Sequence, residues 1–98
     1  MTTAYSWDEV ICEVSEWELD LPDGLSDDDL ITLADARITE ACQDPFGTFD
    51  RKTRTLDGTL VLDALFGQNK VCRTYLNRND PAKAKEHAQG ELEAYLED

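Results

Sequence analysis

The chain has 98 residues, of which 41% are apolar, and its 22 acidic residues outnumber its 9 basic ones to give a formal net charge of -13. This length and composition suit one small domain with a core of its own, and we expect a single domain over residues 1–98. No stretch approaches the roughly 20 apolar residues of a membrane span, and the first residues lack the pattern of a signal peptide. The sequence therefore predicts a cytoplasmic protein that does not bind membranes.

The negative charge is concentrated in the first half of the chain. Residues 1–50 contain 14 acidic residues and a single basic one, whereas residues 51–98 contain 8 of each. Such an asymmetry indicates an interaction surface rather than uniform solubilisation. Adaptation to high salt explains this asymmetry less well, because it would be expected to acidify both halves.

The first predicted element is a helix that begins at Trp7. The preceding Ser6 and the following Glu9 have the S-x-x-E spacing of a capping box. Apolar residues then recur at helical spacing, at Trp7, Val10, Ile11, Val14 and Trp17. The turn sequence Leu-Pro-Asp-Gly at residues 21–24 ends this segment.

A second helix is predicted to follow Ser26, which can cap it. Asp27, Asp28 and Asp29 occupy its first turn, where carboxylates interact favourably with the helix dipole. Its expected buried face consists of Leu30, Ile31, Ala34, Ile38, Ala41 and Cys42.

Residues 48–76 allow two interpretations. Asp57-Gly58 is typical of a type I′ hairpin but also fits a helix start. We favour a helix, because the apolar positions between residues 60 and 76 keep helical spacing over about five turns. The alternative is a short hairpin around residues 53–62.

The last predicted helix begins at Pro81 after an Asn-Asp cap, and its expected buried face consists of Ala84, Ala88, Leu92, Tyr95 and Leu96. Together, these elements predict an all-α fold, a small four-helix bundle-like domain. With the hairpin, the fold would instead be α+β.

The sequence contains no motif that indicates an enzyme or a cofactor. Cys12, Cys42 and Cys72 form no C-x-x-C pair, and their odd number predicts reduced thiols. With His87 they have the ligand types of a zinc site but not its spacing. The five glycines form no phosphate-binding loop, and the aspartates of residues 20–29 do not match a calcium-binding loop. We expect no catalytic residues, no metal ion and no other cofactor.

The carboxylates of the first predicted helix are the strongest candidate site. Glu9, Glu13, Glu16 and Asp20 are 4, 3 and 4 residues apart, which places them on one face of a helix. Like charges at this spacing destabilise a helix by a few tenths of a kcal/mol each, so they have no local benefit. With Asp27, Asp28 and Asp29 they are the predicted partner-binding residues. The alternative is a solvated polar face that only keeps the protein soluble.

These residues predict a small acidic inhibitor that binds a basic surface of a protein, such as a nucleic-acid-binding groove. Direct binding to nucleic acid is not expected, because that requires Lys and Arg to neutralise phosphates. In size, charge and lack of catalytic motifs, the chain resembles the small acidic inhibitors of phages and mobile elements, including anti-restriction DNA mimics and anti-CRISPR proteins. That resemblance implies blockage of a host defence protein.

A second hypothesis is a non-catalytic structural or adaptor domain that binds through an apolar helix face. Exposed Trp7, Trp17 or Tyr75 would favour it. The sequence leaves open whether the chain is a monomer or a homodimer.

Overall fold

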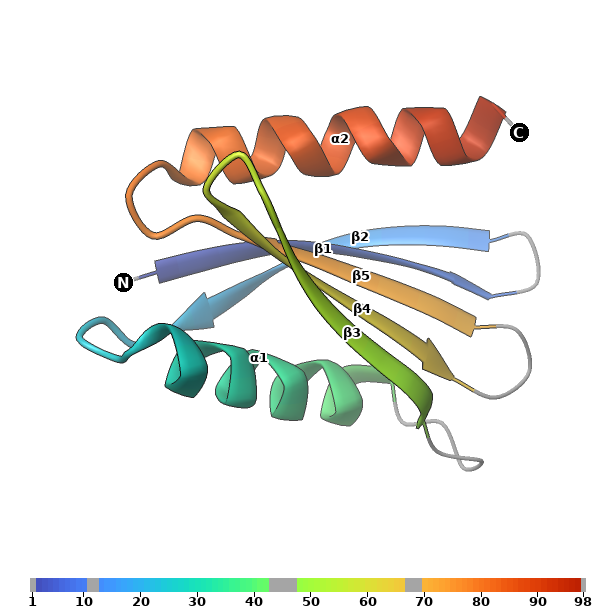
Figure 1. Ribbon diagram of the computed structural model, residues 1–98. Helices are drawn as coiled ribbons and strands as arrows, with labels where there is room; N and C mark the ends of the chain where they lie inside the picture. The colour runs from blue at the N-terminus through green and yellow to red at the C-terminus, as the bar shows by residue number, and fades with distance from the viewer. Residues whose placement is uncertain (1, 11–12, 43–47, 67–69, 98) are drawn as a thin grey trace.

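The computed structural model describes residues 2–10, 13–42, 48–66 and 70–97. They form one five-stranded antiparallel sheet with a helix on each face (Figure 1). The elements in chain order are β1 (Thr2–Val10), β2 (Glu13–Leu21), α1 (Asp27–Cys42), β3 (Thr48–Leu56), β4 (Thr59–Phe66), β5 (Lys70–Leu76) and α2 (Pro81–Glu97). The predicted all-α, four-helix bundle-like fold is therefore wrong, and so is the expectation of a purely helical protein. The fold is α+β, as in the hairpin alternative.

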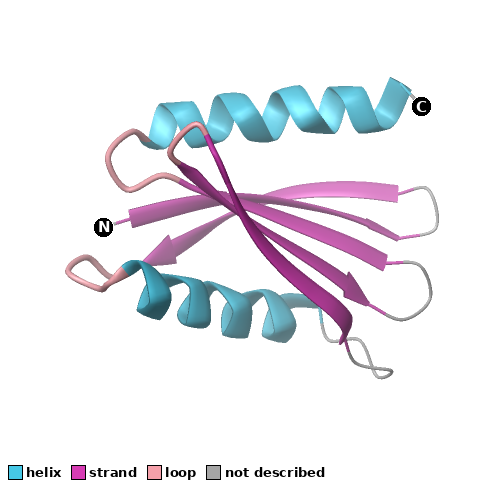
Figure 2. Ribbon diagram, viewed as in Figure 1, coloured by secondary structure: helices cyan, strands magenta, loops and turns pink. Residues whose placement is uncertain are grey.

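The strand order is β2-β1-β5-β4-β3, so that β2 and β3 are the two edges of the sheet. Helix α1 connects these two edges along one face, and α2 lies along the other face (Figure 2). Each helix covers its own hydrophobic cluster. Leu30, Ala34 and Ile38 of α1 pack on one face of the sheet, and α2 packs on the face that includes Trp7 and Tyr75.

Residues 7–10 and 13–21 form strands rather than the predicted first helix. From Glu16 to Leu21, acidic and apolar residues strictly alternate, which is the period of a half-buried strand. Leu19 and Leu21 are buried while the residues between and before them are exposed or half-buried. The helical spacing of the apolar residues from Trp7 onwards was fortuitous, and Ile11 lies outside the described residues.

Residues 59–66 and 70–76 form the inner strands β4 and β5 rather than the predicted long helix. Because helices cover both faces of the sheet, side chains of β4 on both sides are buried, as at Val61 and Leu62. A strand buried on both faces has a nearly continuous apolar run, which periodicity alone does not distinguish from a buried helix. Asp57 and Gly58 both have positive φ, 49° and 80°, and close the β3–β4 hairpin as a type I′ turn does.

The two remaining helices are confirmed. The hydroxyl of Ser26 accepts a hydrogen bond from the Asp29 amide at 3.2 Å and caps α1. Asp80 likewise accepts from the Lys83 amide at 3.2 Å before α2, which begins at Pro81. The predicted buried faces are largely correct, except that Ala41 and Leu96 are exposed.

Candidate protein-binding surface

The edge strand β2 carries three carboxylates on one side of the sheet. Glu16, Glu18 and Asp20 are alternate residues, and alternate residues of a strand point to the same side. This is the side that α2 covers, because Glu16 lies opposite Trp7, which packs against α2. The intervening Leu19 is buried toward α1. We call Glu16, Glu18 and Asp20 the acidic edge.

The acidic edge has no cationic partner among the residues that the structure describes. All three side chains are exposed, and none of them forms an ion pair there. Alternate residues of a strand are separated by about 6.8 Å, so the carboxylates repel one another without local compensation. Such a row has no structural benefit within the chain.

The Lys and Arg side chains, in contrast, are mostly neutralised within the molecule. Their ion pairs are Arg51–Asp35, Lys52–Asp50, Arg54–Glu91, Lys70–Asp8, Arg73–Asp63, Arg78–Asp27 and Lys83–Asp57. Most of these cations are therefore engaged, and the exposed carboxylates that form no ion pair in the described structure lie on β2, on the first turn of α1 and further along both helices, as at Glu40 and Glu86.

Several of these ion pairs form one network beneath α2. Glu91 accepts hydrogen bonds from the Tyr75 hydroxyl at 2.7 Å and from Arg54 Nη2 at 3.0 Å, and Arg73 Nε donates to Asp63 at 2.6 Å. Burial opposes ionisation of Glu91, but the hydrogen bonds from Tyr75 and Arg54 outweigh it and lower the pKa of this carboxyl. Burial and the Glu91 hydrogen bond raise the pKa of Tyr75. This network attaches α2 to the sheet.

Of the other two predicted site residues on the strands, one shares the side of the acidic edge and one does not. Glu9 lies on the neighbouring strand β1, half-buried and opposite Val14, which packs on the α2 side, so Glu9 points to the same side of the sheet as Glu16. Glu13 is exposed on β2, but it is an odd-numbered residue of the strand and points to the side opposite Glu16. The predicted helical stripe therefore does not exist, although Glu9, Glu16 and Asp20 do lie on one face of the sheet.

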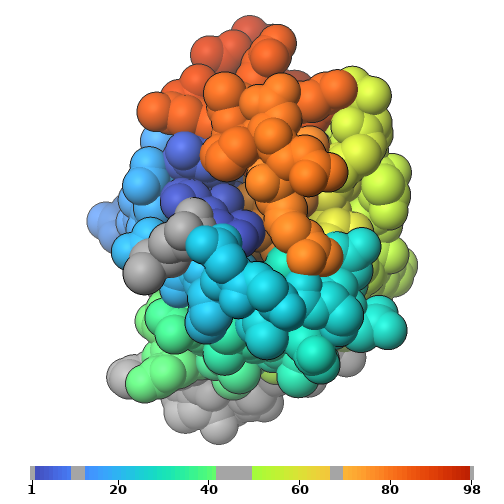
Figure 3. Space-filling model, turned by 90° about the vertical axis from the view of Figure 1, so that its left-hand side faces the viewer, coloured from blue at the N-terminus to red at the C-terminus, as the bar shows by residue number. Residues whose placement is uncertain are grey.

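The other predicted site residues lie at the start of α1. Asp27, Asp28 and Asp29 are all exposed, and Asp27 is paired with Arg78. Figure 3 shows the start of α1 on the same side of the molecule as part of β2. Because α1 covers the other face of the sheet, these aspartates flank the acidic edge and do not continue its row.

Glu18 is the one member of the acidic edge that the sequence analysis missed. A helical stripe through Glu16 and Asp20 excludes Glu18, whereas a strand includes it. The strict alternation of residues 16–21 is the signal that could have identified it.

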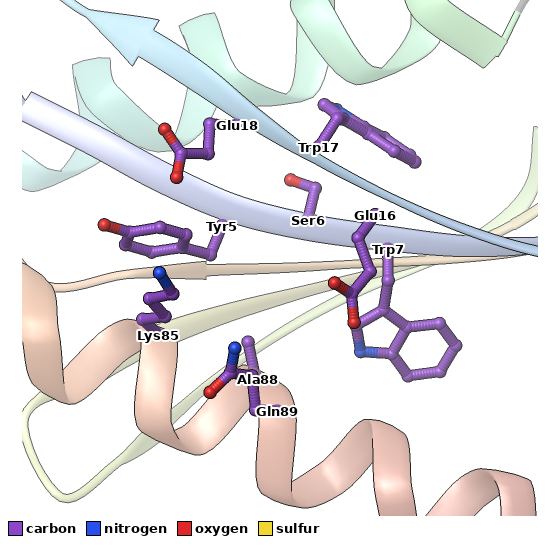
Figure 4. Close-up of a pocket in the computed structure, with 9 residues that line it drawn as sticks. All are labelled: Tyr5, Ser6, Trp7, Glu16, Trp17, Glu18, Lys85, Ala88 and Gln89. Carbon is purple, nitrogen blue, oxygen red and sulfur yellow. The ribbon is translucent and has the colours of Figure 1, made fainter.

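A pocket of about 270 Å³ lies between β2 and α2, beside the acidic edge (Figure 4). Tyr5, Trp7 and Glu16 point toward α2, whereas Trp17 points to the opposite side of the sheet. Lys85 Nζ lies 5.8 Å from the centre of the Tyr5 ring. Trp7 is 1% exposed, and its indole N–H has no hydrogen-bond partner among the described residues. The pocket thus combines aromatic walls, an acidic rim and a buried donor.

The described residues do not assemble a metal site. Within residues 2–10, 13–42, 48–66 and 70–97, no group of three His, Cys, Asp or Glu side chains is placed to hold a metal ion. Cys72 is buried, while Cys12 and the side chain of Cys42 lie outside the described part of the chain. His87 lies 3.9 Å from Asp57, measured from its Nε2 to the carboxylate.

Comparisons with protein-family models, with curated proteins and with solved structures give no match to this chain. In the described residues, neither α1 nor α2 is long and apolar enough to cross a membrane.

Proposed function

We propose that this protein binds a partner protein through the acidic edge and thereby blocks a basic, nucleic-acid-binding surface of that partner. The observation that carries the proposal is the row of three exposed carboxylates on β2 that form no ion pair in the described structure. Opposite charges across an interface speed association and select partners. Asp28 and Asp29, exposed at the start of α1, add to the field near one end of the row.

Inhibition follows from competition for the same cations. A groove that binds nucleic acid carries Lys and Arg side chains that neutralise phosphates. A protein with a fixed row of carboxylates neutralises them too, and it keeps the nucleic acid away while it is bound. This is the mode of action of a nucleic-acid mimic, and it requires neither catalysis nor a cofactor.

The adaptor hypothesis has less support. Its proposed contact residues Trp7 and Tyr75 are 1% and 0% exposed, so their rings pack inside the molecule. Trp17 is half-buried and packs against the cluster under α1. Leu65 on β4 and Leu96 on α2 are 42% and 59% exposed, but two exposed leucines are normal for a protein surface.

The test compares two triple variants with the same net charge. One carries Glu16→Gln, Glu18→Gln and Asp20→Asn, and removes the acidic edge. The control carries Glu40→Gln, Glu86→Gln and Glu93→Gln, which are exposed helical carboxylates. Each immobilised protein is incubated with nucleic-acid-binding proteins that were purified on heparin, at low and high salt and with competing DNA.

The wild-type and control proteins should capture a partner that competing DNA and high salt release. The acidic-edge variant should bind that partner at least about tenfold more weakly, a difference of about 1.4 kcal/mol. Equal capture by the two variants would refute the proposed role of the acidic edge.

A further inference from the structure

The outer side of β2 is open in the described structure. This strand of nine residues pairs with β1 in an unbroken register from Thr2 opposite Leu21 to Val10 opposite Glu13, and β1 is its one neighbour in the sheet. It contains neither proline nor glycine. Helix α2 packs mainly on β1 and β5, and does not cover this edge. An edge strand exposes a row of backbone N–H and C=O groups that can pair with another strand.

The side chains of β2 limit what can pair there. Its α2 side carries the acidic edge, and the opposite side carries Trp17, which is half-buried. In a strand pair, opposite charges on facing residues are stabilising and like charges are destabilising. An added strand therefore needs cationic side chains at alternate positions and can place apolar ones between them, next to Trp17.

On the basis of the proposed function, we propose that the partner supplies an extended basic segment that adds to the sheet as a sixth strand along β2. Its backbone pairs with the open edge, and Lys or Arg residues at positions i, i+2 and i+4 face Glu16, Glu18 and Asp20. This is recognition by strand addition, in which main-chain hydrogen bonds provide affinity and alternate side chains provide specificity.

A second copy of this chain fits the edge less well. Two β2 strands would bring two acidic edges together, which is repulsive. The other edge, β3, is basic, but its Arg54 is held by Glu91 and its Arg51 by Asp35. The register of β3 is also irregular near Thr48, whereas that of β2 is unbroken. The charges therefore favour a segment of another protein.

The buried indole of Trp7 is an independent indication of a ligand beside β2. Its N–H lines the pocket next to Glu16 and has no partner among the described residues. A buried donor without an acceptor is destabilising by about 1–3 kcal/mol. The backbone carbonyls of a strand added along β2 lie in the plane of the sheet, so the acceptor for this donor is a polar side chain that the segment turns toward α2, beside its cationic ones. Gln89, which lines the same pocket, is exposed.

The experiment uses two peptides of identical composition. In one, three Lys residues alternate with Val, and in the other the Lys residues are contiguous and precede the Val residues. Affinity is measured by tryptophan fluorescence, and hydrogen exchange of the β2 amides is followed with and without each peptide. The acidic-edge variant and the Glu40, Glu86 and Glu93 control variant are measured in parallel.

The alternating peptide should bind at least about tenfold more tightly than its isomer, which corresponds to about 1.4 kcal/mol. It should also slow exchange at every second amide of β2, because only those amides point away from β1. The control variant should bind it as the wild type does, and the acidic-edge variant should not.

Equal binding of both peptides, no binding of either, or unchanged exchange in β2 would overturn strand addition. These outcomes would not refute the proposed function, which the triple variants test separately. The acidic edge can bind a folded basic surface by charge complementarity without any added strand. Self-association of the purified protein would also overturn the proposal if Lys52→Glu, a substitution on β3, abolished it. That result would mean that β3 of a second copy occupies the β2 edge.

Discussion

At the scale of single residues, Glu91 makes the most concentrated set of polar contacts in the described structure. It accepts hydrogen bonds from Tyr75, Arg54 and Arg73, which joins α2 to strands β3 and β5. Its side chain is 27% exposed. The pKa of Glu91 is lower in the folded protein than its ordinary value of 4.5. A carboxyl with a depressed folded pKa stabilises the fold above its unfolded pKa, and this contribution is lost as the pH falls through the folded value.

We therefore predict that Glu91→Gln lowers the free energy of unfolding by about 1.5–3 kcal/mol at neutral pH, because hydrogen bonds to a charged group are lost. The deficit should begin to shrink as the pH falls below the ordinary value of 4.5 and should disappear below the lower pKa of folded Glu91, where the wild-type carboxyl is itself protonated. Urea denaturation at neutral and acidic pH measures both effects. Glu93→Gln, at an exposed position on α2, serves as the control. A deficit that is equally large in acid would mean that packing, not the carboxylate, is responsible.

At the scale of elements, the β3–β4 hairpin depends on its two turn residues. Gly58 has φ of 80°, a conformation that is strained for a residue with a side chain. A Cβ at this position would meet only the Asn77 Nδ2 atom, at 4.0 Å, so space is not the constraint. Gly90 lies inside α2, where an added Cβ would meet no atom within 4 Å.

The same substitution should therefore have opposite effects at these two glycines. Gly58→Ala should destabilise the protein by about 1–2 kcal/mol through backbone strain. Gly90→Ala should stabilise it by about 0.5–1 kcal/mol, because alanine favours a helix. Thermal and urea denaturation of the two variants measure the difference. Stabilisation by both substitutions would show that the turn tolerates a different backbone conformation.

At the scale of the whole molecule, the net charge of -13 opposes the compact state. Salt screens this repulsion, so the melting temperature should rise as salt is added to a low-salt buffer. The acidic-edge variant should be more stable than the wild type at low salt, by about 0.2–1 kcal/mol for each relieved like-charge pair. The control variant, with the same net charge, should gain less, because its three carboxylates are not arranged in one row. A melting temperature independent of salt would contradict this prediction.

The sequence by itself determined the features that depend on neighbouring residues. The cap at Ser26 and the proline at residue 81 placed both helices correctly, because capping and proline geometry act within one helical turn. The Asp57-Gly58 turn was recognised only as the alternative to a helix start, although its backbone requires residues that tolerate positive φ. The excess of negative charge in the first half of the chain needed no structure at all.

The tertiary structure decided how the strands pair and which of them are buried on both faces. Strand β1 lies between β2 and β5, and the buried Ser6 hydroxyl donates to Thr74, 68 residues away. No local pattern contains such a contact. A local pattern also does not show that helices cover both faces of β4. Because of that burial, the apolar pattern of the β4 sequence resembles that of a buried helix. Once β2 is a strand and not a helix, Glu18 joins Glu16 and Asp20 while Glu13 leaves them, because side chains repeat every 2 residues in a strand and every 3.6 in a helix.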